Sequence, residues 1–116
     1  MKFLEEVVAE EFLPTFRSML TTNLRQRGLT QAEVAEKLGI SQSAVSKYAQ
    51  GQVSRRPEIE GDDRVRDLVD DLGQGLASGD MRPVQALIEA ELLIRRLSQG
   101  EDLIATIHEE TMPELR

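Results

Sequence analysis

The feature that most constrains the fold is the stretch Leu29–Gly51, which combines the start, stop and start signals of two short helices. Its sequence is LTQAEVAEKLGISQSAVSKYAQG. Thr30 and Glu33 have the spacing of a capping box, in which two side chains satisfy backbone donors at a helix start. Gly39 can adopt the left-handed conformation that a tight interhelical turn requires, and Ser41 is a favourable N-cap. We therefore predict two helices joined through a glycine turn.

The apolar residues of this stretch predict how the two helices pack. Val34, Ala35 and Leu38 share one face of the first helix, because residues three and four apart lie on the same side. The small side chain of Ala35 allows the helices to cross closely, Ile40 fills the gap at the turn, and Val45 closes the packing from the second helix. Few unrelated sequences satisfy all of these positions together.

The second helix has one polar face without any acidic residue. At 100° per residue, Ala44, Val45 and Tyr48 fall on the opposite arc, which packs on the core. Polar side chains of this kind bind base edges and phosphates, and short serines let a helix sit deep in a major groove. A merely solvated face is the alternative interpretation. The polar residues are Gln42, Ser43, Ser46, Lys47 and Gln50.

The charge distribution favours the DNA interpretation. The whole chain has a net charge of −7, which is unusual for a DNA-binding protein. Residues 13–57 nevertheless have a local charge of +5. A basic segment inside an acidic chain is typical of a nucleic-acid-binding surface. The basic residues are Arg17, Arg25, Arg27, Lys37, Lys47, Arg55 and Arg56, and the acidic ones are Glu33 and Glu36.

The rest of the chain also has helical periodicity, so the predicted fold is all-α. We expect a helix-turn-helix head at residues 1–60 that includes its own N-terminal helix, and a C-terminal helical extension at residues 61–116. The predicted helices outside the central stretch are 2–12, 14–28, 64–77, 83–98 and 102–112. The glycines and proline in residues 51–63 indicate a long loop between head and extension.

Composition excludes several classes of function. The chain has no cysteine, which excludes disulfides, thiolate metal sites and cysteine nucleophiles. With His108 as the single histidine and no glycine-rich phosphate loop, we expect no enzyme activity and no metal or other cofactor. No apolar run is long enough to span a membrane, and the N-terminus is not a signal peptide. A cytoplasmic protein is expected.

On these residues the chain resembles the lambda-repressor-like, Cro/C1-type (XRE) helix-turn-helix regulators. The beginning EEVVAEEFLPTFRSML, followed by the stretch above, is also similar to a family of predicted archaeal transcriptional regulators. Some members of that family continue into a thiamine-phosphate-synthase-like ligand domain, which we do not expect here unless the chain is a fragment. Others have cysteines near the equivalents of Glu91, Ile94 and Ile104, and this chain has none. Abundant acid with scarce lysine resembles proteins of salt-loving archaea.

The resemblance implies which residues contact DNA. It assigns base contacts to Gln42, Ser43, Ser46 and Lys47, while Ser41 and Gln50 complete the set at the two ends of that helix. Gln31 is expected to donate to a phosphate together with the N-terminal amides of the preceding helix. Arg55 and Arg56 are expected to bind the flanking backbone, with a solvated loop as the alternative.

The expected partners are double-stranded DNA and a second copy of the chain, and the effector is unknown. Helix-turn-helix proteins usually read two half-sites about one turn of DNA apart, so we expect a homodimer. Residues 64–112 have more apolar side chains than a small head needs, and they are the expected interface, with residues 3–12 as a further candidate. Glu91 and Arg95 are predicted either to form a pair at a helix rim or to be buried and set the register of the dimer.

Two other functions remain open from the sequence. An antitoxin-like or adaptor protein could keep this fold while binding a partner protein. The chain could also be the DNA-binding half of a longer regulator that senses a ligand. The sequence therefore predicts a sequence-specific transcriptional regulator, with these two alternatives.

Overall fold

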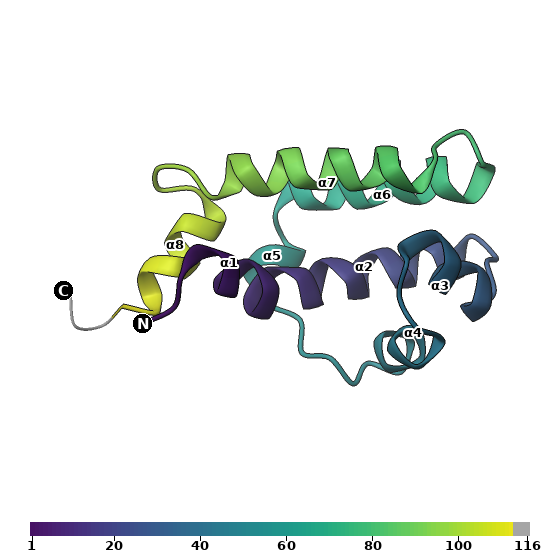
Figure 1. Ribbon diagram of the computed structural model, residues 1–116, viewed down its shortest axis with the longest axis horizontal. Helices are drawn as coiled ribbons and strands as arrows, with labels where there is room; N and C mark the ends of the chain where they lie inside the picture. The colour runs from purple at the N-terminus through teal and green to yellow at the C-terminus, as the bar shows by residue number, and fades with distance from the viewer. Residues whose placement is uncertain (113–116) are drawn as a thin grey trace.

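The computed structural model describes residues 1–112, which fold entirely into helices and connecting turns (Figure 1). No strand occurs in this part of the chain, so the all-α prediction is confirmed. The helices in chain order are α1 (Leu4–Val7), the π-helix η1 (Val8–Phe12), α2 (Leu13–Gln26), α3 (Gln31–Leu38), α4 (Gln42–Ala49), α5 (Pro57–Glu60), α6 (Asp63–Ser78), α7 (Pro83–Leu97) and α8 (Leu103–Glu110).

The prediction of separate helices before and after Pro14 was wrong, because α1, η1 and α2 run on as one continuous helix. Proline lacks a backbone N–H, and its ring clashes with the carbonyl four residues earlier in a regular α-helix. The wider π turn just before Pro14 relieves this conflict, and the Leu13 N–H bonds to the Val8 carbonyl five residues back. The π spacing also buries both Val7 and Phe12.

The helix α2 lies at the centre of the molecule and packs against α3, α4, α5 and α6. In Figure 1, α6 and α7 form a layer above it, and α4 lies at the lower edge. One cluster of buried side chains holds these helices together, including stacked rings of Phe12 and Phe16 with centroids 5.6 Å apart. Leu24, Val45, Leu72 and Leu97 come from four different helices of this cluster and are almost fully buried.

Close contact between α2 and α6 explains a glycine in the middle of a helix. A Cβ atom on Gly73 would collide with the end of the Asn23 side chain, which accepts a hydrogen bond from Arg27 at 2.7 Å, so a larger residue would have to displace that side chain. One turn away, Arg27, the residue that follows α2, donates to Asp70 on α6 at 2.8 Å. Residues on both sides of position 60 therefore contribute to one core, and the division into a head and an extension stays a prediction.

The long loop predicted at residues 51–63 is interrupted by the short helix α5. Pro57 occupies a favourable early position, and Ile59 is fully buried between two exposed or half-buried glutamates. A helix of one turn with a single apolar side chain leaves no periodic pattern in the sequence, which is why the prediction missed it.

The C-terminal helix α8 packs back on the N-terminal segment, as Figure 1 shows. The His108 ring nitrogen Nε2 lies 2.8 Å from the Lys2 carbonyl oxygen. Arg64 at the start of α6 also binds Asp102, which caps the start of α8. None of the helices described is long and apolar enough to cross a membrane.

Candidate nucleic-acid interface

The turn between α3 and α4 has the geometry that the sequence predicts. Thr30 Oγ1 accepts the Glu33 N–H at 3.1 Å, and Glu33 Oε1 accepts the Thr30 N–H at 2.9 Å. The backbone bond from Thr30 lowers the pKa of Glu33. Gly39 has a φ of 64°, in the left-handed region, and the next residue donates its N–H to the Ala35 carbonyl at 3.1 Å. The capping box and the glycine turn are confirmed.

The start and the core face of α4 are also confirmed. Ser41 Oγ accepts the Ala44 N–H at 3.1 Å, which is the N-cap bond. Val45 is fully buried, and Ala44 and Tyr48 are half-buried beside it. The helix is therefore fixed by its apolar side against α2 and α3.

The polar side of α4 points outward. Gln42, Ser43, Lys47 and Gln50 are exposed. Ser46 is half-buried, and its hydroxyl accepts Gln50 Nε2 at 3.0 Å. Gln50 Oε1 in turn accepts Gln52 Nε2 at 2.9 Å, so a short chain of bonds orders the end of the helix. Gln31 lies half-buried at the first position of α3.

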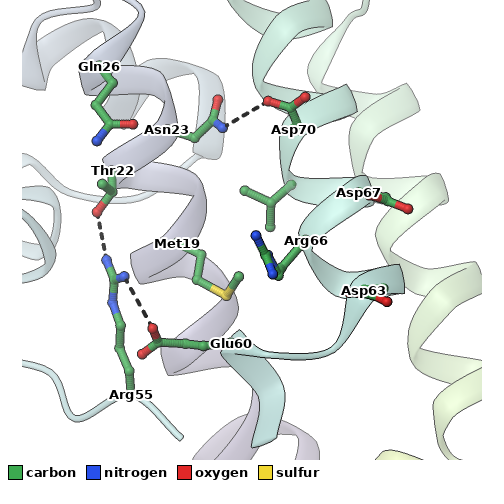
Figure 2. Close-up of a pocket in the computed structure, with 11 residues that line it drawn as sticks. Met19, Thr22, Asn23, Gln26, Arg55, Glu60, Asp63, Arg66, Asp67 and Asp70 are labelled. Carbon is green, nitrogen blue, oxygen red and sulfur yellow. Dashed lines mark hydrogen bonds and ion pairs between the residues drawn. The ribbon is translucent and has the colours of Figure 1, made fainter. Parts of the chain in front are cut away.

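Arg55, which follows α4, is bound to α2. Its Nε donates to Ser18 Oγ at 2.8 Å, and its Nη2 donates to the Ser18 carbonyl at 3.0 Å and to Thr22 Oγ1 at 2.6 Å. Its Nη1 lies 3.9 Å from Glu60 (Figure 2). Most of the donors expected to bind a phosphate thus already have protein partners.

Arg56 has three acidic neighbours. Its Nε donates to Glu11 at 2.9 Å, and its Nη1 lies 3.3 Å from Glu58 and 3.9 Å from Glu110. The bond from Arg56 is the main cause of the lowered pKa of Glu11, and desolvation opposes it. The Arg56 backbone N–H also donates to Thr15 Oγ1 at 3.0 Å. This arginine joins η1, α5 and α8.

Comparison with known families identifies the segment that contains this geometry. Residues 23–60 match the family model described as helix-turn-helix. This segment is similar to Cro/C1-type helix-turn-helix domains. No match was found among curated proteins or among solved structures. The likeness to archaeal regulators that the sequence indicated extends beyond the matched segment and stays a prediction.

The helix-turn-helix domain includes every residue predicted to contact DNA, from Gln31 to Arg56. DNA binding is the function that such a domain suggests, and domains of this kind are typically not enzymes. The structure gathers the α4 residues on one exposed face, whereas Arg55 and Arg56 lie beside α2 with intramolecular partners.

The electrostatics of the helix-turn-helix domain differ from what the local charge of +5 suggests. Arg27, Arg55 and Arg56 have acidic neighbours on other elements at 2.8 to 3.9 Å. Lys47 is the one basic residue within α4, and it forms no ion pair with residues 1–112. The exposed face of α4 is therefore only mildly basic.

The residues that sequence reasoning missed are hydroxyls on α2. Thr15 and Ser18 are 1% exposed and Thr22 is half-buried, and they accept the hydrogen bonds from Arg55 and Arg56. Their spacing of three and four residues places them on one side of the helix. A row of hydroxyl residues with this spacing on α2 was the available signal, because buried hydroxyls need partners.

A polar cleft lies beside the contacts of Arg55. It has a volume of about 560 Å³ and lies between α2 and α6 (Figure 2). Glu60, Asp63, Asp67 and Asp70 line it together with Arg55. Arg66 also lines the cleft, but the acidic residues outnumber the two arginines, so the lining disfavours phosphate.

Proposed function

We propose that the chain is a sequence-specific DNA-binding transcription regulator that reads the major groove with α4. The observation that carries this proposal is the orientation of α4. Its apolar side is held against the core, while Gln42, Ser43 and Lys47 are exposed on a side without acid. A helix must present such a side outward to enter a groove and bond base edges.

The proposed contacts divide into two groups. Gln42, Ser43, Ser46 and Lys47 bind base edges, and Gln50 does so at the end of the helix. Gln31 and the cap residue Ser41 lie at the first turns of α3 and α4, where backbone N–H groups attract phosphate. Both groups use atoms that face outward from the turn.

Arg55 and Arg56 have a secondary part in this proposal. Their side chains are about 30% exposed, and some of their N–H groups have no protein partner among the residues described and can bind a flanking phosphate. Their first role is to hold the segment after α4 against α2, η1 and α5. Because few free cations surround α4, counterion release contributes little and base contacts carry more of the affinity.

A homodimer completes the proposed regulator, because two copies of α4 can read two half-sites. Two acidic copies also repel phosphate except at the α4 faces, which favours one docking orientation.

The test is selection of bound sites from a random DNA pool, followed by fluorescence anisotropy on the selected duplex and a scrambled duplex of the same composition. We expect binding at least about 1,000-fold tighter to the selected duplex. Equal binding to both duplexes, together with a tight complex with a protein partner, would instead support the adaptor function. The proposal fails in that case.

A further inference from the structure

One helix has an apolar face that the chain leaves uncovered. Four large apolar side chains of α7 are more than half exposed: Val84 at 53%, Leu87 at 59%, Ile88 at 53% and Leu92 at 55%. At 100° per residue they lie on one side of α7, opposite Ala86 and Leu97, which are buried in the core. Such a concentrated apolar surface marks an interaction site more often than a solvated face.

An apolar trough runs alongside this face. A hollow of about 230 Å³ lies between α7 and the helices η1, α2 and α3, with Leu87 on its wall. A second hollow continues from it between α7 and α1. The two hollows share Val8, Leu13, Glu91 and Ile94, so they form one continuous surface along α7.

Charges around the trough are complementary across its two walls. Arg17 and Lys37 are on the wall formed by α2 and α3, and Glu91 is on the α7 wall. None of the three forms an ion pair within residues 1–112. The α7 region also has Arg82, Arg95 and Arg96 against Glu89 and Glu91, so it is not acidic like most of the chain.

We propose that a second copy of the chain docks on this surface, with the two α7 helices antiparallel. Leu87 of each copy enters the trough of the other, and Glu91 of each copy approaches Arg17 and Lys37 across the interface. A two-fold arrangement makes both contacts twice, because the same patch serves both copies. Opposite charges meet, although each chain has a net charge of −7.

The size and position of the surface suit this occupant. A 15-residue helix is about 22 Å long, and a stable interface needs about 800 Å² from each partner. The apolar face of α7 supplies part of that area, and the trough walls from α1, η1 and α3 add to it. Figure 1 shows α7 at the upper edge and α4 at the lower edge, so pairing through α7 leaves α4 uncovered.

The first test measures mass by sedimentation velocity over a range of concentrations. We expect the wild-type chain to have twice its 13.0 kDa mass. Leu87→Glu and Ile88→Glu should raise the dimer dissociation constant by about 100-fold or more, because each places a charge in the apolar contact. Gln74→Glu is the matched control, since it adds the same charge on the exposed outer side of α6. Circular dichroism should show equal helicity in all variants.

A charge exchange tests the orientation. Glu91→Arg should weaken the dimer, and adding Lys37→Glu should restore most of the loss. A wild-type monomer, or dimers that persist in both Leu87→Glu and Ile88→Glu, would overturn the proposal. These results are distinct from the DNA-binding test, because a monomer can still bind a selected half-site through α4.

Discussion

Arg55 donates two hydrogen bonds to Ser18, from Nε to the hydroxyl at 2.8 Å and from Nη2 to the backbone carbonyl at 3.0 Å. The pair joins the segment after α4 to the middle of α2, across 37 residues of sequence. Since α2 is the central helix of the core, this contact helps to fix where the C-terminal end of α4 lies. A residue that looks like a DNA contact in the sequence therefore has a structural role.

Replacing Arg55 tests that role. Arg55→Ala should lower the free energy of unfolding by about 1–2 kcal/mol, because it removes charge-assisted bonds that are partly screened by solvent. Ser18→Ala should have a smaller effect, and the double variant should cost less than the sum of the two, measured by urea denaturation. If Arg55→Ala keeps full stability but reduces the salt dependence of DNA binding, the arginine is a phosphate contact instead.

Substitutions on the exposed side of α4 should reduce the affinity for DNA and leave the stability of the fold unchanged. Gln42→Ala should weaken binding to the selected duplex by about 1–3 kcal/mol while binding to a scrambled duplex changes little. Lys47→Ala should likewise weaken binding to the selected duplex more than binding to the scrambled duplex, because Lys47 is proposed to contact a base edge. Both variants should unfold at the wild-type temperature, because both side chains are exposed. A loss of helicity in either variant would contradict the proposal that these side chains contact DNA and do not contribute to the packing of the core.

Substitution of Gly39, the glycine of the turn, should instead reduce the stability of the domain. A Cβ on Gly39 meets no atom within 4 Å, so the cost of a substitution comes from its φ of 64° and not from a collision. Gly39→Val should therefore destabilise the domain by about 1–3 kcal/mol, since a β-branched residue is strained in the left-handed region. Gly39→Asn is the control, because asparagine tolerates that conformation. Similar melting temperatures for the two variants would show that backbone strain is not the cause.

A buried hydroxyl on α2 offers a stabilising substitution. Thr21 is fully buried, and its Oγ1 has no hydrogen-bond partner in the part of the chain that the structure describes. Thr21→Val replaces the hydroxyl with a methyl group of similar size, so the free energy of unfolding should rise by about 1 kcal/mol. Thermal denaturation measures the change, with Thr106→Val as the contrast, because it removes a hydroxyl that donates to the Glu101 carbonyl at 2.9 Å and should not stabilise the fold. Destabilisation by Thr21→Val would mean that the hydroxyl has a partner, such as a bound water.

The pair between α6 and α8 predicts a pH dependence. Arg64 donates to both oxygens of Asp102 at 2.7 and 2.9 Å, and these bonds are the main cause that lowers the pKa of Asp102 to about 2. A carboxyl whose pKa is lowered on folding stabilises the folded state above its ordinary pKa, and this stabilisation is lost as pH falls from about 4 to about 2. Asp102→Asn should therefore lower stability at pH 7 by about 1 kcal/mol, because the pair is partly exposed.

The difference between wild type and Asp102→Asn should disappear near pH 2, as measured by urea denaturation at several pH values. Asp67→Asn is the matched control, because its carboxylate is exposed on α6 and forms no ion pair with the residues described. A constant difference at every pH would show that Asp102 acts only as the cap of α8.

Local signals determined the helix-turn-helix segment. The capping pair of Thr30 and Glu33, the turn at Gly39 and the cap at Ser41 act within three or four residues of one another, so the sequence alone contains what their geometry needs. The periodicity of apolar residues likewise predicted the all-α fold and the outward side of α4.

Only the tertiary structure determined which charged side chains pair and which helical segments form where the apolar periodicity is interrupted. Glu11 and Glu110, which lie close to Arg56, are 45 and 54 residues away from it in sequence, and no local pattern pairs them. The π turn before Pro14 and the one-turn helix around Ile59 depend on packing against the core. Burial of an apolar side chain stabilises each of them, although the local preference for helix is weak there. Helix signals are local and can be read along the chain, whereas an ion pair or an uncovered face depends on which distant segments folding brings together.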